Sequence, residues 1–176
     1  MTVFEALAER YSFRGAYQSA AVPREDLKKI LEAGLAAPSG CNAQTAFLVG
    51  IDDPEMIKKS ADILGKQNLA TAPAGIFAIT LARPSYKDMY FNIQDYSAAI
   101  ENMLLAISGL GYASCWIEGE ITSDRKMQKA FGKLLDVPDE YTVVAYLPVG
   151  VPAKPGKRAA HKPFEERAFF NGFGKK

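Results

Sequence analysis

Short apolar runs alternate along the chain with segments in which apolar residues recur at helical spacing. The apolar runs at residues 46–51, 74–81, 113–117 and 141–149 predict four strands. The segments between them predict about five helices. This mixture indicates an α/β or an α+β fold.

The first two helices are predicted from their composition and their flanking prolines. Val3 to Glu9 forms a short amphipathic segment. Pro23 stands where a helix would have its first turn, and Pro38 stands where that helix would stop. Its expected apolar face consists of Leu27, Ile30, Leu31 and Leu35.

Two further helices are predicted from residues typical of helix ends. Asp53 is expected to cap a helix that has Pro54 in its first turn and Gly65 just past its end. Ser123 is expected to cap a later helix, whose apolar face consists of Met127, Phe131, Leu134 and Leu135.

The segment from Asp95 to Leu110 has apolar residues on nearly all sides, which is typical of a helix buried in the core. A helix of that length spans about 24 Å. Because it carries Asp95 and Glu101, a transmembrane role is disfavoured. Gly109 and Gly111 are expected to end it.

The composition predicts one soluble domain that covers residues 1–176. The chain is 48% hydrophobic and 23% charged, within the ordinary range for globular proteins. Its 21 basic and 20 acidic residues leave a net charge of +1. So small a charge provides no field to hold nucleic acid or an anionic membrane, and we expect neither partner.

The few cysteines and histidines restrict the possible chemistry. Cys41 and Cys115 form no CxxC motif, which fits a reducing compartment. With His161 as the one histidine, no metal site of the Cys/His type is expected, and Ser–His or Cys–His catalysis would depend on that single residue. The first ten residues lack the apolar core of a signal peptide, so we expect a cytoplasmic protein.

The tail from residue 150 to residue 176 differs in character from the rest of the chain. It is rich in Pro, Gly and Lys, yet it contains four phenylalanines: Phe164, Phe169, Phe170 and Phe173. That is too much apolar surface to leave in water. We expect the tail to pack on another surface.

The glycine motifs of the nucleotide-binding α/β folds are absent, because no GxGxxG follows a strand and no GxxxxGK[ST] occurs. A different signal lies at Arg10, Ser12 and Arg14, which alternate along the chain. In an extended segment they would face one side and could present two guanidinium groups and a hydroxyl to a phosphate. The alternative is a set of solvated charges after a short helix.

Three other segments allow both a ligand-binding and a structural interpretation. The small, polar residues 39–44 suit a loop that lies against a flat polar ligand, or a plain connection from helix to strand. In the run 116–119, Gly119 permits a close approach of the backbone to a ligand, or forms a simple turn. The aromatic residues Tyr86, Tyr90 and Phe91 could form a lid over a ligand or a patch against a neighbouring subunit.

Taken together, the order and spacing of these segments resemble the nitroreductase family of FMN-dependent NAD(P)H oxidoreductases. The family's Arg-x-Ser-x-Arg/Lys segment corresponds to residues 10–14, and its Ala-Pro-Ser-x-x-Asn-x-Gln loop to residues 37–44. Its Asp followed by an apolar helix corresponds to residues 95–111, which include Asn-Met-Leu-Leu-Ala. Its glycine turn and closing strand correspond to Ile117-Glu118-Gly119 and to residues 147–150.

The resemblance implies an α+β fold in which helices flank a central, mostly antiparallel sheet in an intertwined homodimer. FMN would bind at the subunit interface, and residues 150–176 would form an arm that packs on the partner subunit. NAD(P)H would serve as co-substrate, and nitro compounds, quinones or related small molecules would accept the electrons in a ping-pong cycle.

The resemblance also implies roles for single residues. Arg10 and Ser12 would hold the FMN phosphate. Arg14 would face the pyrimidine edge, where a guanidinium stabilises the negative charge of reduced flavin. Glu118 and Gly119 would line the N5 edge, so that the catalytic residues are Arg14, Glu118 and Gly119. The full cofactor-binding set would be Arg10, Tyr11, Ser12, Arg14, Pro38, Ser39, Gly40, Asn42, Gln44, Ile117, Glu118, Gly119, Lys157 and Arg158.

Pro38, Ser39, Gly40 and Asn42 would reach the cofactor from the other subunit. The sequence departs from the family at two points, one just after this loop and one near the end of the chain. Thr45-Ala46-Phe47 replaces the Pro and aromatic residue that usually follow the loop glutamine. His161 stands where the family carries a basic phosphate ligand, so that Lys157, Arg158 or Lys162 would substitute for it.

Two other functions stay open from the sequence. The chain is short for the family, and one alternative is a flavin-binding homodimer without nicotinamide-dependent reductase turnover. The other alternative is an interaction domain without a cofactor.

Overall fold

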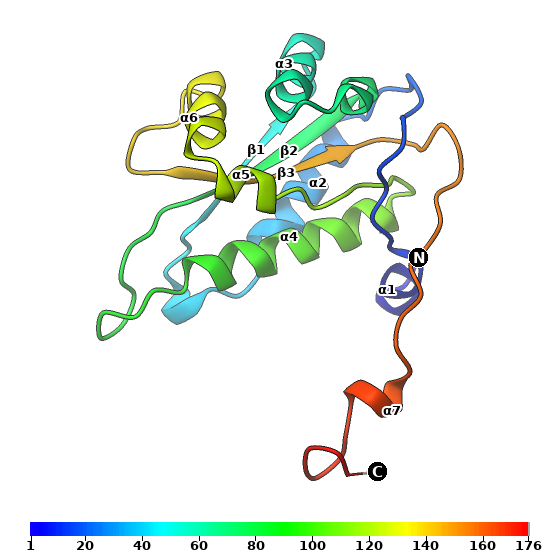
Figure 1. Ribbon diagram of the computed structural model, residues 1–176, viewed down its shortest axis with the longest axis vertical. Helices are drawn as coiled ribbons and strands as arrows, with labels where there is room; N and C mark the ends of the chain where they lie inside the picture. Colours follow the sequence, from blue (N-terminus) through cyan, green and yellow to red (C-terminus); the bar gives the residue numbers. More distant parts are fainter. Residues whose placement is uncertain (176) are drawn as a thin grey trace.

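A three-stranded antiparallel sheet lies at the centre of the computed structural model, which describes residues 1–175 (Figure 1). Its strands are β1 (Ala46–Ile51), β2 (Ala74–Thr80) and β3 (Thr142–Val149). They lie in the order β1-β2-β3, so that β2 is paired on both sides.

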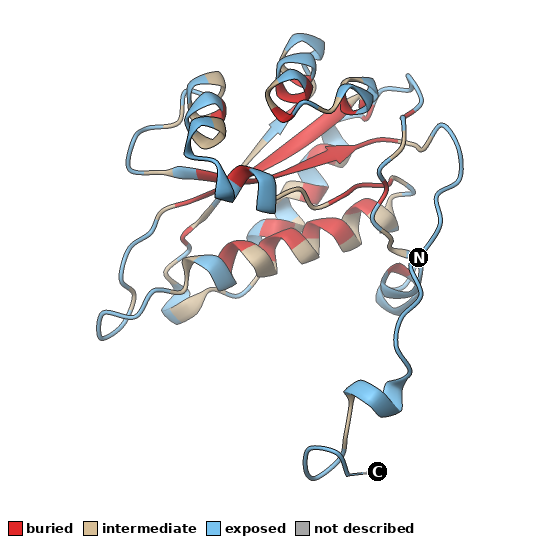
Figure 2. Ribbon diagram, viewed as in Figure 1, coloured by how far each residue is buried: buried red, intermediate tan, exposed pale blue. Residues whose placement is uncertain are grey.

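The central strand separates two hydrophobic cores, because successive side chains of a strand point to opposite faces. Ile76 and Ala78 of β2 belong to the core on one face. Phe77 and Ile79 belong to the core on the other. Every residue of β2 is buried, as the red central arrow in Figure 2 shows.

The first face is covered by α2 (Arg24–Leu35) and α4 (Asn92–Gly109), which pack against each other and against β1. The α4 helix is the long helix that runs beneath the sheet in Figure 1. Its residues Ile100, Met103 and Ile107 are almost fully buried. The short helix α1 (Val3–Glu9) lies against α4.

The second face is covered by α3 (Pro54–Leu64) and α6 (Arg125–Leu134), with α5 (Gly119–Ser123) beside α6 (Figure 1). A 3-10 helix, η2 (Gln67–Thr71), packs against α3. Two more short elements lie outside this layer, η1 (Gly40–Asn42) and α7 (Phe164–Arg167). Helices on both faces of an antiparallel sheet confirm the predicted α+β class.

Most predicted helices are present with small shifts at their ends. Asp53 caps α3 by accepting hydrogen bonds from the backbone of Glu55 and Met56, and Gly65 ends it with a φ of 65°. The α4 helix begins at Asn92, one turn before the predicted Asp95. The α2 helix begins at Arg24, after Pro23.

Two details of the helix prediction are wrong. Leu35 is 65% exposed, because it lies at the last position of α2 instead of on its buried face. Asp124, not Ser123, caps α6 by accepting a hydrogen bond from the backbone N–H of Lys126. Ser123 instead ends α5, where its hydroxyl donates to the carbonyl of Glu120.

The predicted strand at 113–117 is also wrong, since this segment forms only isolated bridges. Ala113 pairs with Gly150 and Ile117 pairs with Tyr146, which places Cys115 opposite Pro148. A proline has no N–H to donate, so the hydrogen-bonded ladder is interrupted between the two bridges.

The tail leaves the body of the protein after a short pairing with residues 16–18. The N–H of Ala153 donates to the carbonyl of Ala16, and Gln18 bonds to Val151 and Pro152. Beyond this point the tail extends away from the sheet, and Phe164, Phe170 and Phe173 are exposed (Figure 2). Among the described residues, no helix has the length and hydropathy needed to cross a membrane.

Candidate functional site

Several of the predicted site residues line one cavity of about 350 Å³, which we call the Arg14 cavity. The start of η2 and the segment before α5 both contribute to its wall. The residues that line it are Phe13, Arg14, Lys66, Asn68, Leu69, Cys115, Trp116, Ile117, Glu118, Gly119 and Glu120. The structure therefore brings Arg14 together with Ile117, Glu118 and Gly119.

Two positive charges border the Arg14 cavity. Arg14 is fixed through its backbone, since its carbonyl accepts a hydrogen bond of 3.0 Å from the side-chain amide of Asn68. Lys66 pairs with Glu120 at 2.9 Å. Burial raises the pKa of the Cys115 thiol, while the charges of Arg14 and Lys66 act in the opposite direction. Both cations therefore lie near the part of the cavity wall that Cys115 forms.

The turn at residues 117–119 is held by the sheet and leaves one side open. The N–H of Ile117 donates to the carbonyl of Tyr146 at 3.1 Å, and the N–H of Tyr146 donates back at 2.9 Å. A Cβ added to Gly119 would meet no atom within 4 Å. The backbone at Gly119 is thus accessible to a flat group in the cavity.

A second cavity, of about 490 Å³, lies between the N-terminal segment and the start of the tail. We call it the arm cavity. Ser12 and Arg14 line it from one side, and Lys154 and Lys157 line it from the other. Arg14 thus borders both cavities, and the structure places Lys157 with the predicted phosphate ligand Ser12.

Arg10 and Tyr11 lie next to these cavities, in a narrow crevice beside α4. Arg10 pairs with Glu101 of α4. Ser114, across the crevice, is 3% exposed, and its hydroxyl has no hydrogen-bond partner among the described residues. A buried hydroxyl without a partner, in a crevice that an arginine also lines, fits a site for an oxyanion.

The loop with Pro38, Ser39, Gly40, Asn42 and Gln44 lies elsewhere, and none of these residues lines either cavity. The loop packs at the first turn of α4, where the buried carboxylate of Asp95 accepts a hydrogen bond of 2.8 Å from the N–H of Gly40. The same carboxylate accepts a bond of 2.5 Å from the hydroxyl of Thr45. Arg158 is exposed and also lines neither cavity.

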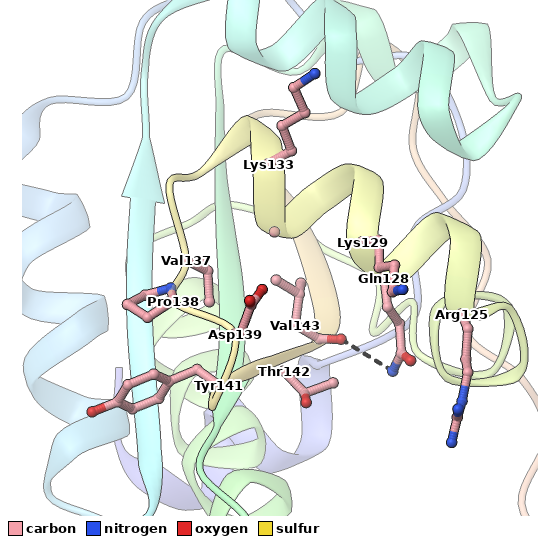
Figure 3. A pocket seen from close by; sticks show the side chains of 11 residues that line it. Arg125, Gln128, Lys129, Lys133, Val137, Pro138, Asp139, Tyr141, Thr142 and Val143 are labelled. Carbon is pink, nitrogen blue, oxygen red and sulfur yellow. Dashed lines mark hydrogen bonds between the residues drawn. The ribbon is translucent and has the colours of Figure 1, made fainter.

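Another groove, of about 570 Å³, lies between α6 and β3 and contains none of the predicted site residues. Figure 3 shows that the side chains of Arg125 and Lys133 point away from each other. Gln128 closes part of it by donating to the carbonyl of Val143 at 3.4 Å. Its charges do not converge on a common point.

Sequence reasoning missed Lys66, Asn68 and Trp116 of the Arg14 cavity. Lys66 and Asn68 follow the glycine that ends α3, in a segment with no motif to distinguish it from an ordinary turn. The side-chain N–H of Trp116 is buried without a partner among the described residues. A signal for Trp116 existed, because it lies next to the predicted Ile117-Glu118-Gly119 turn.

Comparison with known proteins extends this description. The profile of the nitroreductase family matches residues 7–71 and 56–151. A protein of Archaeoglobus fulgidus, provisionally named NADH dehydrogenase/NAD(P)H nitroreductase, is 34% identical over 139 residues, which cover 77% of this chain and 78% of that protein. A protein of the same provisional name from Methanothermobacter thermautotrophicus is 29% identical over 93% of this chain and 84% of its own length.

Solved structures share the fold. An FMN-dependent nitroreductase from Clostridium difficile R20291 superposes with a TM-score of 0.80 and 29% identity, over 97% of this chain and 99% of that chain. Because the matches to the family profile together cover residues 7–151, the chain belongs to the nitroreductase family.

Proposed function

We propose that the protein is an FMN-dependent oxidoreductase that uses NAD(P)H to reduce nitro, quinone or related small-molecule acceptors. The observation that carries this proposal is the Arg14 cavity, where Arg14 and Lys66 border the same space as the open backbone at Gly119. Bound FMN would supply the redox chemistry, taking electrons from the nicotinamide and passing them to the acceptor.

The residues present fit this cofactor. A guanidinium at the cavity wall complements the pyrimidine edge of a flavin, which becomes negatively charged on reduction. Arg14 would stabilise that charge, and the accessible backbone at Gly119 would line the N5 edge. Ile117 holds this turn in place through its two hydrogen bonds with Tyr146.

The phosphate would lie toward the arm cavity and the crevice beside α4. Ser12 and Lys157 line the first, and Arg10 and Tyr11 line the second. The unpartnered hydroxyl of Ser114 provides a further donor there. In this arrangement Lys157, not Arg158, replaces the basic residue that the family carries at the position of His161.

We further propose that the chain functions as a homodimer. The loop with Pro38, Ser39, Gly40, Asn42 and Gln44 does not reach the Arg14 cavity of its own chain, so it would complete the site of the partner subunit. The exposed aromatic residues of the arm, residues 150–176, would be buried on that partner. Both cysteines are free, which fits the cytoplasm as its compartment.

A ping-pong cycle follows from a single binding space. The oxidised nicotinamide must leave the Arg14 cavity before an acceptor can enter it, because both need the same open side. The second candidate function is a flavin-binding homodimer without reductase turnover, since the Thr45-Ala46-Phe47 segment differs from the family beneath the loop.

Visible spectra of the purified protein test these proposals. We expect flavin absorbance bands from a stoichiometric cofactor and anaerobic bleaching of those bands by NADH or NADPH. Bands that persist with both nicotinamides would favour the second candidate. A protein that retains no flavin after incubation with FMN would overturn both.

A further inference from the structure

Glu118 borders the Arg14 cavity, and its side-chain carboxylate accepts a hydrogen bond from a buried tyrosine of α4. The hydroxyl of Tyr96 donates a hydrogen bond of 2.7 Å to Oε1 of Glu118. Tyr96 is only 4% exposed, whereas Glu118 is half-buried at the cavity wall. This bond joins the helix beneath the sheet to the turn that leads into α5.

The turn is thereby fixed at two consecutive residues. The backbone of Ile117 is held by its pair of hydrogen bonds with Tyr146 in β3. The side chain of Glu118 is held by Tyr96. With one residue tied to the sheet and the next tied to α4, the Glu118–Gly119 peptide has little freedom to rotate.

Tyr96 is itself well anchored. Its neighbour Asp95 accepts hydrogen bonds from Gly40 and Thr45, so the first turn of α4 is attached to two other segments. Burial, followed by the bond to Glu118, raises the pKa of the Tyr96 hydroxyl above its ordinary range. The hydroxyl therefore remains a donor at neutral and moderately alkaline pH.

We propose that Tyr96 is a positioning residue, which fixes the Glu118–Gly119 peptide at the wall of the Arg14 cavity through the carboxylate of Glu118. The inference rests on the proposed function, in which an N–H of this turn faces N5 of the flavin. In this arrangement the side chain of Glu118 binds Tyr96 of α4, and the backbone of the turn faces the cofactor.

The first test compares Tyr96→Phe with Tyr112→Phe. Tyr112 offers a matched control for exchange and potential, because its hydroxyl donates at 2.8 Å to Asp26, and its ring lines the crevice beside α4 instead of the Arg14 cavity. In the protein without cofactor, we expect amide hydrogen exchange at residues 117–120 to be about tenfold faster in Tyr96→Phe, the effect of losing one bond to a charged acceptor. Tyr112→Phe should leave this exchange unchanged.

The second test uses the flavin-loaded protein. Loss of the fixed N–H at N5 should weaken FMN binding by about tenfold in Tyr96→Phe. It should also raise the reduction potential of the bound flavin, because an N–H donor at N5 favours the oxidised form. Tyr112→Phe, which also loses one hydroxyl bond to a carboxylate, should leave the potential of the bound flavin unchanged.

A double-mutant cycle then tests whether Tyr96 acts through Glu118. If it does, Tyr96→Phe combined with Glu118→Ala should bind FMN no more weakly than Glu118→Ala alone. Glu118→Gln should retain most of the affinity, since the amide oxygen still accepts from the tyrosine.

The outcomes separate this inference from the proposed function. Additive losses in the cycle would overturn the positioning role, and so would a Tyr96→Phe variant with wild-type exchange and potential. Either result would leave the proposed function intact if the wild-type protein binds FMN. Failure of the wild-type protein to bind FMN would overturn the proposed function and this inference together.

Discussion

Nε of Arg10 lies 3.6 Å from Oε1 of Glu101, which joins the residue after α1 to the middle of α4. The Arg10 side chain is 27% exposed and the Glu101 side chain 45% exposed, so water reaches both. A pair of this kind contributes little to stability. Its effect is to hold the guanidinium at the crevice that contains Ser114, where an incoming phosphate would meet it.

Replacing Arg10 with Ala should therefore weaken FMN binding. The loss of one charge-assisted hydrogen bond should cost about 2 kcal/mol, or about thirtyfold in affinity. Quenching of flavin fluorescence during titration measures the dissociation constant. Riboflavin, which lacks the phosphate, provides the control and should bind the variant and the wild-type protein equally. Equal loss for both ligands would place the phosphate elsewhere.

Arg14→Met should separate binding from redox tuning. The variant keeps an unbranched side chain and removes a charge that, in the proposed site, would interact more strongly with reduced than with oxidised flavin. A differential loss of about 1.4 kcal/mol lowers a two-electron potential by about 30 mV. FMN binding should weaken less than in Arg10→Ala, because the phosphate contacts remain.

A reductive titration against a reference dye measures this potential. The control is Arg24→Met, since Arg24 pairs with Asp52 and does not line the Arg14 cavity. If Arg14→Met and Arg24→Met both keep the wild-type potential, Arg14 does not face the pyrimidine edge.

Asp95→Ala should destabilise the fold, because it removes a buried carboxylate that accepts hydrogen bonds from Gly40 and Thr45. We expect the free energy of unfolding in urea to fall by about 3 kcal/mol, the combined effect of two bonds to a charged group. Thr45→Val removes one of the two bonds and should cost about half as much. Equal losses in the two variants would show that the bond to Gly40 contributes nothing.

Tyr146→Phe should stabilise the protein. The Tyr146 hydroxyl is buried and has no hydrogen-bond partner among the described residues, so its removal should raise the free energy of unfolding by about 1 kcal/mol. Burial also raises the pKa of Tyr146. The folded state then resists ionisation of this tyrosine, and the wild-type protein loses stability as the pH rises above the ordinary tyrosine value of about 10.

The advantage of Tyr146→Phe should consequently grow above that pH, which urea unfolding at neutral and alkaline pH would show. Tyr17→Phe is the comparison, because the Tyr17 hydroxyl donates to the carbonyl of Pro148 at 3.5 Å. It should give no gain at neutral pH. A loss of stability in Tyr146→Phe would indicate a partner for its hydroxyl.

Removal of residues 163–176 should disrupt the proposed dimer. These residues contain the exposed Phe164, Phe170 and Phe173, and the intact interface should exceed a standard area of roughly 1,600 Å². In sedimentation at micromolar concentration, we expect the full chain to be a dimer and the truncated chain a monomer. A full chain that sediments as a monomer with FMN bound would contradict the shared site.

The sequence predicted best where local signals act alone. Asp53, Pro54 and Gly65 define both ends of α3 without help from the rest of the fold. The strand at 113–117 could not be excluded in this way, because its interruption depends on Pro148 from a distant segment. The same limit applies to Leu35, whose exposure depends on where α2 ends against its neighbours.

In the candidate site, too, the residues with local sequence signals could be predicted, and those placed by distant segments could not. The turn at 117–119 and the Arg10 to Arg14 segment carry recognisable residues, and Arg14 does share a cavity with Glu118. Lys66 and Asn68 reach that cavity only because α3 packs where it does, which no local pattern in the sequence encodes. The bond from Tyr96 to Glu118 likewise joins residues that are 22 positions apart.

The backbone of the loop before β1 limits which residues its positions can accept. Cys41, Asn42 and Gln44 have φ angles of 53°, 56° and 50°, whereas Ala43 between them has a φ of −71°. A β-branched side chain is strongly disfavoured at positive φ, and asparagine and glycine are favoured there. In a saturation library of this loop, valine, isoleucine and threonine should be lost at 41, 42 and 44 and retained at 43. A mutant library designed to accept new electron acceptors could therefore vary position 43 without a backbone restriction. At positions 41, 42 and 44 the backbone conformation alone restricts the choice to a few residue types.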